Sequence, residues 1–241
     1  MIRSIAWGAL AVGIAVAPGA AKAAHHEPVT QVVTVEVMPG KLEAYRAEVK
    51  KLAAVVARID AMAKVRMWEA TAAGENTGQV LVGIEYPNAA AWAADSAKTQ
   101  ADPEWKAIVA KLPGMRTLLS TSIWRDVSPN PAANTAATAG ILVLTGVEVQ
   151  PGKFEDYLSR LKAGRAITDR IGTKSQLRLW RAELAGTNTG SVAVGVEYPD
   201  LATYVADQAK LAGDAEWKKH FAGLDAVRKV QSRSLYREIT P

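Results

Sequence analysis

The residues best suited to chemistry in this sequence are arginines and glutamates that share short β-branched segments with tryptophan. Arg66 precedes Trp68 by two positions, and Glu85 ends a run of valine, leucine and isoleucine. The same pattern returns 112 positions later (178 − 66) as Arg178, Trp180 and Glu197. A carboxylate beside a guanidinium in a protein core is either a neutralised structural pair or part of a polar pocket that orients a small molecule. The sequence leaves both interpretations open.

Several kinds of site are excluded or disfavoured by composition. The chain has no cysteine, so disulfides, thiolate metal sites and a cysteine nucleophile are excluded. Its three histidines are His25, His26 and His220. One histidine in the folded region argues against a Ser-His-Asp triad or a histidine metal site, so we predict no metal and no cofactor.

His25 and His26 carry a separate hypothesis. Cleavage after Ala23 would place His26 third in the mature chain, where an amine, backbone nitrogens and an imidazole can bind Cu(II) in a square plane. The alternative is an exported terminus with no role.

Length and charge favour a globular protein with no nucleic-acid partner. The chain has 241 residues, 49% of them hydrophobic, which is enough to bury a core. Its net charge of +5 comes from mixed charges, without a lysine or arginine block of the kind that binds nucleic acid.

The N-terminus predicts a signal peptide over residues 1–23. Arg3 precedes an apolar run at residues 5–16, and Ala21-Lys22-Ala23 fits a small-residue cleavage site. The run is shorter than the roughly 20 residues that span a bilayer, so we expect a periplasmic or secreted protein that is not inserted in the membrane after signal removal.

An internal duplication determines the expected domain organisation. At the offset of 112, Pro39-Gly40-Lys41 matches Pro151-Gly152-Lys153, and Glu85-Tyr86-Pro87 matches Glu197-Tyr198-Pro199. A repeat this long predicts two modules, each with its own secondary structure. We place them at residues 28–127 and 141–241, joined by a linker at residues 128–140 that is rich in Pro, Ala, Asn and Thr.

Each copy has the pattern of a ferredoxin-like βαββαβ module. Alternating apolar residues predict strands at 30–37, 64–71, 80–86 and 118–126, and three- and four-residue spacing predicts helices at 42–59 and 89–99. The second copy repeats this order with strands at 141–149, 176–184, 192–198 and 230–238. Such a module is an antiparallel sheet with both helices on one face. We therefore expect an α+β protein in which the two modules pack sheet to sheet as an intramolecular α/β barrel.

At this point the sequence resembles a known family. The Pro-Gly-Lys turn between strand and helix, Arg66-Met67-Trp68, Glu85-Tyr86-Pro87 and the Asp-x-Glu-Trp at 102–105 are similar to the dimeric α/β-barrel superfamily. The antibiotic-biosynthesis-monooxygenase-like branch is the nearest. The resemblance implies a monomeric pseudo-dimer, with further dimerisation left open. The superfamily includes cofactor-free oxygenases, haem enzymes and isomerases, so the resemblance implies a fold and no single reaction.

Strand alternation indicates which side chains point into the barrel. If Val35 and Val80 pack on the helices, Glu36 and Glu85 face the opposite sheet. The candidate ligand-binding residues are Glu36, Arg66, Trp68, Glu85, Trp124, Glu148, Arg178, Trp180, Glu197 and Tyr236. We expect Ser120, Ser122, Ser232 and Ser234 beside them, and a turn role for Asn76 and Asn188. His220 is expected to be a solvated or partly buried helix residue, not a haem ligand.

Three functions are compatible with this pattern. The first is binding of a small polar or aromatic molecule inside the barrel. The second is a cofactor-independent monooxygenase acting on an electron-rich aromatic substrate, with Glu36, Glu85 or their copies Glu148 and Glu197 as the base if burial raises the pKa. The third is a structural or interaction protein whose barrel is filled by its own side chains.

Overall fold

The computed structural model describes residues 27–128, 140–240 of the chain. The predicted signal peptide, His25, His26 and most of the predicted linker lie outside the described residues. No helix within the described ranges is long and apolar enough to cross a membrane.

The first module alternates strands and helices in the expected order. Its elements are β1 (Val29–Val37), α2 (Leu42–Arg58), β2 (Lys64–Ala72), β3 (Val80–Tyr86), α3 (Ala89–Ala101), α4 (Pro103–Val109) and β4 (Arg116–Asp126). The turn after β1 uses Gly40 at a φ of 72°, a conformation that glycine adopts without strain. Helix α3 ends and α4 begins at Asp102, whose side chain accepts a hydrogen bond from the Trp105 backbone N–H at 2.9 Å and caps α4.

The second module repeats these elements. They are β5 (Ile141–Val149), α5 (Phe154–Ile171), β6 (Gln176–Leu184), β7 (Val192–Tyr198), α6 (Leu201–Gly213), α7 (Ala215–Gly223) and β8 (Arg228–Glu238). Asp214 caps α7 as Asp102 caps α4, at 2.7 Å from the Trp217 backbone nitrogen. The duplication read from the sequence is therefore also a structural duplication.

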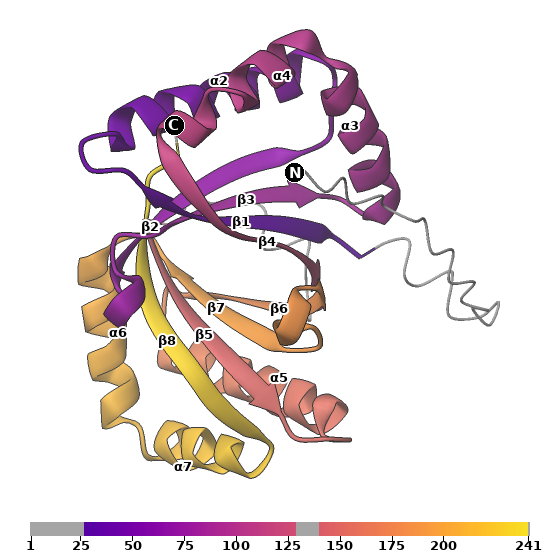
Figure 1. Ribbon diagram of the computed structural model, residues 1–241. Coiled ribbons are helices and arrows are strands. Elements are labelled where there is room, and N and C mark those ends of the chain that lie inside the picture. The colour runs from indigo at the N-terminus through magenta and orange to yellow at the C-terminus, as the bar shows by residue number, and fades with distance from the viewer. Residues whose placement is uncertain (1–26, 129–139, 241) are drawn as a thin grey trace, which may run out of the picture.

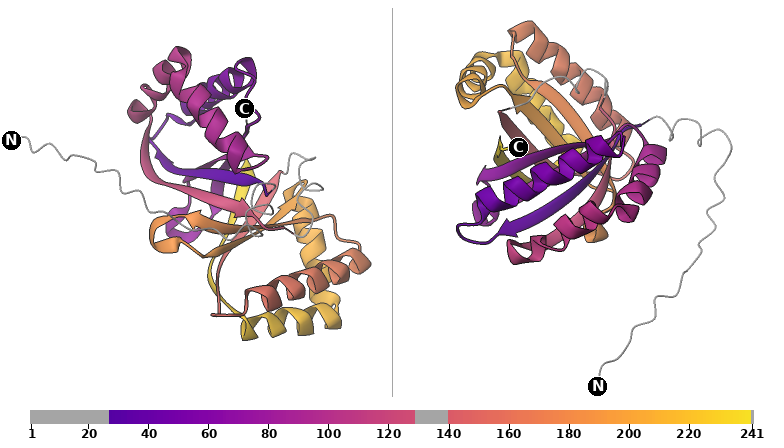
Figure 2. Two further views of the ribbon diagram at one scale, coloured as in Figure 1. Left: turned by 90° about the vertical axis from the view of Figure 1, so that its right-hand side faces the viewer. Right: turned by 90° about the horizontal axis from the view of Figure 1, so that it is seen from above.

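The eight strands form one closed antiparallel barrel, in the order β1-β3-β2-β8-β5-β7-β6-β4. Within each module the outer strands pair with the inner ones, and the seams β2–β8 and β4–β6 join the modules. The helices of the two modules lie on opposite outer sides of the barrel (Figure 1). Two further views show the same arrangement, with each set of helices covering its own half (Figure 2). The predicted α+β fold, two ferredoxin-like modules packed as an intramolecular barrel, is confirmed.

Every neighbouring pair of strands is antiparallel, so each end of the barrel carries the starts of four strands and the ends of the other four. The first residues of β1, β2, β5 and β6 lie at the same end as the last residues of β3, β4, β7 and β8. We call this the closed end. The opposite, hairpin end carries the β2–β3 and β6–β7 connections, at residues 73–79 and 185–191.

Alternate residues of each strand face the helices or the barrel interior. Val35, Met67 and Val80 pack with Tyr45 and Val49 of α2 in the core between sheet and helices. On each strand, the residues that alternate with these point into the barrel, and Trp68 is one of them. The helix-facing core is thus separate from the barrel interior.

Two glycines leave space for two tryptophans inside the barrel. A Cβ at Gly83 would lie 2.9 Å from Trp68, and a Cβ at Gly195 would lie 2.5 Å from Trp180. Real Cβ atoms do not approach a ring so closely, so each glycine lets an indole lie flat against the neighbouring strand.

We predict that Gly83→Ala and Gly195→Ala each lower the free energy of unfolding by about 1–3 kcal/mol, because the methyl group must displace a buried indole. Urea unfolding followed by circular dichroism measures this. Gly213→Ala is the matched control, since a Cβ there meets nothing within 4 Å. Equal stability of all three variants would show that the glycines are not needed to seat the indoles.

Candidate functional site

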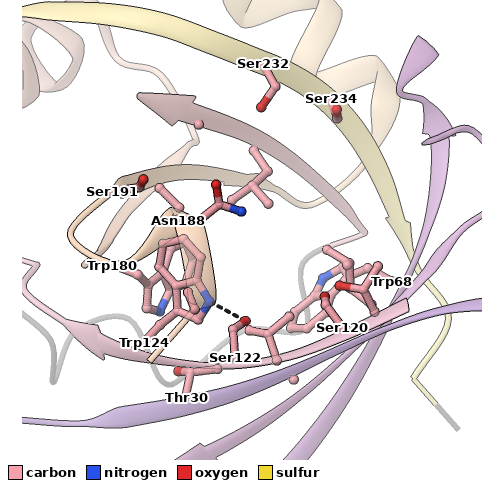
Figure 3. Close-up of a pocket in the computed structure, with 18 of the residues that line it drawn as sticks. Thr30, Trp68, Ser120, Ser122, Trp124, Trp180, Asn188, Ser191, Ser232 and Ser234 are labelled. Atoms are coloured by element: carbon pink, nitrogen blue, oxygen red, sulfur yellow. Dashed lines mark hydrogen bonds between the residues drawn. The ribbon is translucent and has the colours of Figure 1, made fainter. Parts of the chain in front are cut away.

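A cavity of about 430 Å³ occupies the barrel interior and is lined by both modules. Its aromatic lining consists of Trp68, Trp124, Trp180 and Tyr236. Its hydroxyl and amide lining consists of Thr30, Thr34, Asn76, Gln79, Ser120, Thr121, Ser122, Asn188, Ser191, Gln231, Ser232 and Ser234. In Figure 3, Ser232 and Ser234 of β8 lie across the cavity from Ser120 and Ser122 of β4. Asn188 is seen between Ser232 and Trp180 in this view.

The cavity opens at the hairpin end and narrows toward the closed end. On β8, Ser232 is exposed, Ser234 is half-buried and Tyr236 is buried. On β4, Ser120 is exposed and Ser122 is half-buried. A solute entering from the hairpin end would therefore meet hydroxyl groups first and aromatic rings at depth.

Six charged side chains close the far end, and we call them the charged floor. They are Arg66, Glu85, Asp126, Arg178, Glu197 and Glu238. Arg66 donates to both carboxylate oxygens of Glu238, at 3.1 and 2.9 Å, and to Glu197 at 2.9 Å. Both hydrogen-bonded carboxylates belong to the second module, whereas Arg66 belongs to the first, as does Glu85, whose Oε1 is 4.0 Å from Arg66.

Arg178 makes the reciprocal contacts. It donates to Glu85 at 2.5 Å and to Asp126 at 3.1 Å, and both of these residues belong to the first module. The offset of 112 relates Arg66 to Arg178, Glu85 to Glu197 and Asp126 to Glu238. The floor is thus a pair of cross-module ion clusters related by the duplication.

Each arginine also lies over a tryptophan of its own strand. The guanidinium carbon of Arg66 is 4.6 Å from the Trp68 ring centre, and that of Arg178 is 4.7 Å from the Trp180 ring centre. Such a cation–π contact stabilises a buried guanidinium and fixes its plane. The indoles thereby orient the arginines for the cross-module pairs.

Charge is not balanced in the floor, because four carboxylates face two guanidiniums. Glu197 is 3% exposed, and its Oε2 has no hydrogen-bond partner among the described residues. Burial raises the pKa of Glu197 above its ordinary value, more than the nearby Arg66 lowers it. Glu197 is therefore the group in the floor best placed to hold a proton.

The structure brings together eight of the ten residues selected from the sequence. Arg66, Glu85, Arg178 and Glu197 belong to the floor, and Trp68, Trp124, Trp180 and Tyr236 line the cavity. Glu36 and Glu148 do not join them. Both are exposed near the hairpin end, where Glu148 accepts a hydrogen bond from Gln231 at 2.6 Å.

Sequence reasoning missed Asp126 and Glu238 in the floor. Each lies two positions after a selected aromatic residue, Trp124 or Tyr236, and so shares its strand face. Extending the alternation to the last residue of each strand would have found both.

Comparison with known proteins identifies relatives by structure only. No family model matches the chain, and no curated protein matches its sequence. A candidate monooxygenase of Fusobacterium nucleatum superposes with a TM-score of 0.59 at 12% identity, covering 88% of this chain and 93% of that one. An anthrone oxidase-like protein gives a TM-score of 0.57 at 14% identity, covering 89% and 92%. A haem-binding protein of Thermus thermophilus gives 0.53 at 8% identity, covering 89% and 91%. Identities this low establish a shared fold alone and say nothing about whether an activity is shared.

One similar structure is that of a haem-binding protein, and His220 is the one histidine among residues 27–128 and 140–240 that could serve as a haem ligand. It borders a second cavity, of about 400 Å³, between the helices and the sheet of the second module. A Cβ at Gly164 would lie 2.7 Å from His220 Nε2, so this nitrogen is packed against α5. A haem ligand must instead direct a nitrogen into open space at the iron. As arranged, His220 does not fit a haem ligand, and burial lowers its pKa.

We predict that Arg178→Met lowers the free energy of unfolding by about 3–5 kcal/mol, because it leaves the buried Asp126 and the partly buried Glu85 without their nearest cation. Arg237→Met is the matched control, since Arg237 is 60% exposed and pairs with Glu69 at the surface. Its expected loss is about 0–1 kcal/mol. Thermal and urea unfolding measure both. If Arg178→Met lowers the free energy of unfolding by no more than Arg237→Met does, the charged floor does not stabilise the contact between the modules.

We predict a pH signature for Glu197. Since its pKa is raised by folding, the folded chain holds a proton that the unfolded chain releases at lower pH. Its contribution to stability is therefore present below the ordinary pKa of 4.5 and is lost as the pH rises through the folded pKa. Glu197→Gln should remove this decline, whereas Glu148→Gln, at an exposed carboxylate, should keep it. Urea midpoints between about pH 4 and pH 8 report the difference, and parallel curves for wild type and Glu197→Gln would contradict it.

Proposed function

Since the chain has the fold of the dimeric α/β-barrel superfamily, closed within one chain, we propose that it binds a small polar or aromatic molecule in the barrel cavity. The carrying observation is the cavity of about 430 Å³, with aromatic rings at depth and hydroxyl and amide groups near its mouth. Pockets for small molecules combine a largely apolar lining with a few oriented polar groups. With the predicted signal peptide, the proposal is a binding protein of the periplasm or the medium.

Small residues at inward positions support this proposal over a filled barrel. An eight-stranded barrel is just wide enough for its own side chains to fill it or for one small ligand to be held. Here Gly83, Gly146, Ala193 and several serines line the cavity where larger side chains would close it. The interior therefore keeps its volume because of the residue types at these positions.

Unsatisfied polar atoms near the cavity also support a ligand. Thr30 is 5% exposed, and its Oγ1 has no partner among the described residues. A buried hydroxyl without a partner costs free energy, so such a group is expected to meet a ligand or water in the working protein.

A cofactor-independent oxygenase is the second candidate. Its specific support is Glu85, the only charged side chain among the described residues that line the cavity. A carboxylate base could take the proton of an electron-rich phenol that then reacts with oxygen. It ranks second because Glu85 is already engaged by Arg178, whose guanidinium donates a hydrogen bond to it at 2.5 Å.

We predict that 2-phenylethanol binds the mature protein saturably and changes its tryptophan fluorescence, because three tryptophans line the cavity. Ser234→Leu, which fills the cavity from β8, should abolish the response. Ser159→Leu, on the exposed side of α5, should leave it unchanged.

A response that survives Ser234→Leu would place binding elsewhere and contradict the proposal. Oxygen uptake when an electron-rich phenol replaces the alcohol would instead support the oxygenase candidate.

A further inference from the structure

We propose that the barrel cavity selects a small aromatic amine in its cationic form, held at a single site by Glu85, Thr30 and Trp124. This inference rests on the proposed binding function and adds the charge and position of the ligand. Three observations support it: the charge around the cavity, the strand register that sets these residues side by side, and the loss of the same arrangement in the second module.

The cavity presents negative charge and no positive charge from its described lining. Glu85 lines it, whereas Arg66 and Arg178 do not. Glu85 accepts the Arg178 hydrogen bond through Oε1, and its Oε2 has no hydrogen-bond partner among the described residues. A ligand at the floor therefore meets a carboxylate before it meets a guanidinium. Together with the excess of carboxylates in the floor, this arrangement favours a cation and disfavours an anion.

Strand register places the three residues in one row on the inner face. On β1, Thr30 pairs with Glu85 of β3 on one side and with Trp124 of β4 on the other. Directly opposed residues of neighbouring strands have Cβ atoms about 4.5–5.5 Å apart. An ammonium group between Glu85 and the Thr30 hydroxyl would thus have its aromatic part within reach of the Trp124 ring. The Nε1–H of Trp124 already donates a hydrogen bond to Ser122 Oγ at 2.8 Å.

The second module carries the same row with its polar centre replaced. Leu142 stands where the first module has Thr30, pairing with Glu197 of β7 and with Tyr236 of β8. Leu142 packs with Trp68 and Tyr236 in an apolar cluster. Glu197 is 3% exposed and does not line the cavity, in contrast to Glu85. The duplication therefore contains two copies of the row, of which only the first has a carboxylate that lines the cavity, with a threonine beside it.

The test uses three probes of nearly equal shape and different charge: phenethylamine, 2-phenylethanol and phenylacetate. Isothermal titration of the full mature chain at pH 7 measures their dissociation constants. We expect the amine to bind at least about tenfold more tightly than the alcohol, because a charge-assisted hydrogen bond replaces a neutral one. Phenylacetate should bind more weakly than both.

Three variants and one control test which residues cause the preference for the amine. Glu85→Gln should reduce the amine-to-alcohol preference to about twofold or less while the alcohol still binds, because only the charge is removed. Thr30→Leu, which copies the second module, should weaken the amine at least as much. Thr30→Val, which has nearly the same shape, separates loss of the hydroxyl from loss of space. Glu69→Gln, at the surface pair with Arg237, is the control that keeps the preference.

The outcomes separate this inference from the function it rests on. If none of the three probes binds the folded protein, the proposed function itself fails. If the alcohol binds as tightly as the amine, or if Glu85→Gln keeps the preference, the cavity binds ligands but is not selective for cations. If phenylacetate binds most tightly, the charge assignment of the floor is wrong.

Discussion

The exchange of ion pairs across the closed end is the interaction on which the rest of the structure depends. Arg66 and Arg178 each donate hydrogen bonds to carboxylates of the other module. Buried ions are costly to desolvate, so these contacts are more effective in fixing geometry than in adding stability. They join the two modules through side chains at the closed end, in addition to the backbone pairing of β2 with β8 and of β4 with β6, and they form the floor of the cavity.

A nearly symmetric framework here encloses asymmetric contents. The floor and the stacked tryptophans repeat at the offset of 112, and so do the glycines behind those tryptophans. Among the many positions that differ, some border the cavities. Thr30 corresponds to Leu142 in the barrel, and the buried pair Leu52 and Ile108 corresponds to Gly164 and His220 under the helices. The arginines of the floor and most polar and aromatic residues of the barrel cavity are therefore shared between the copies, while Thr30, Leu52 and Ile108 have counterparts of a different type.

The sequence predicted the architecture well because repetition and alternation are local signals. Matching Pro39-Gly40-Lys41 to its copy required no knowledge of packing, and strand period separates Val35 from its inward neighbours. The position along the barrel axis is not local. Glu36 lies beyond a register shift between Thr34 and Val35, at the exposed end of β1, and no period in the sequence reports this. The sequence also did not indicate that Gly164 leaves space for a side chain, because that side chain, His220, lies on another helix.

Closure of the barrel within one polypeptide has a consequence for how such a protein can change over generations. When two identical chains form a barrel, a single altered codon appears twice, so a substitution that helps one half is imposed on the other. In this chain the halves are separate stretches of one gene, and Thr30 can persist while its counterpart becomes Leu142. Covalent fusion thus releases one half to specialise while the other keeps the shared scaffold intact.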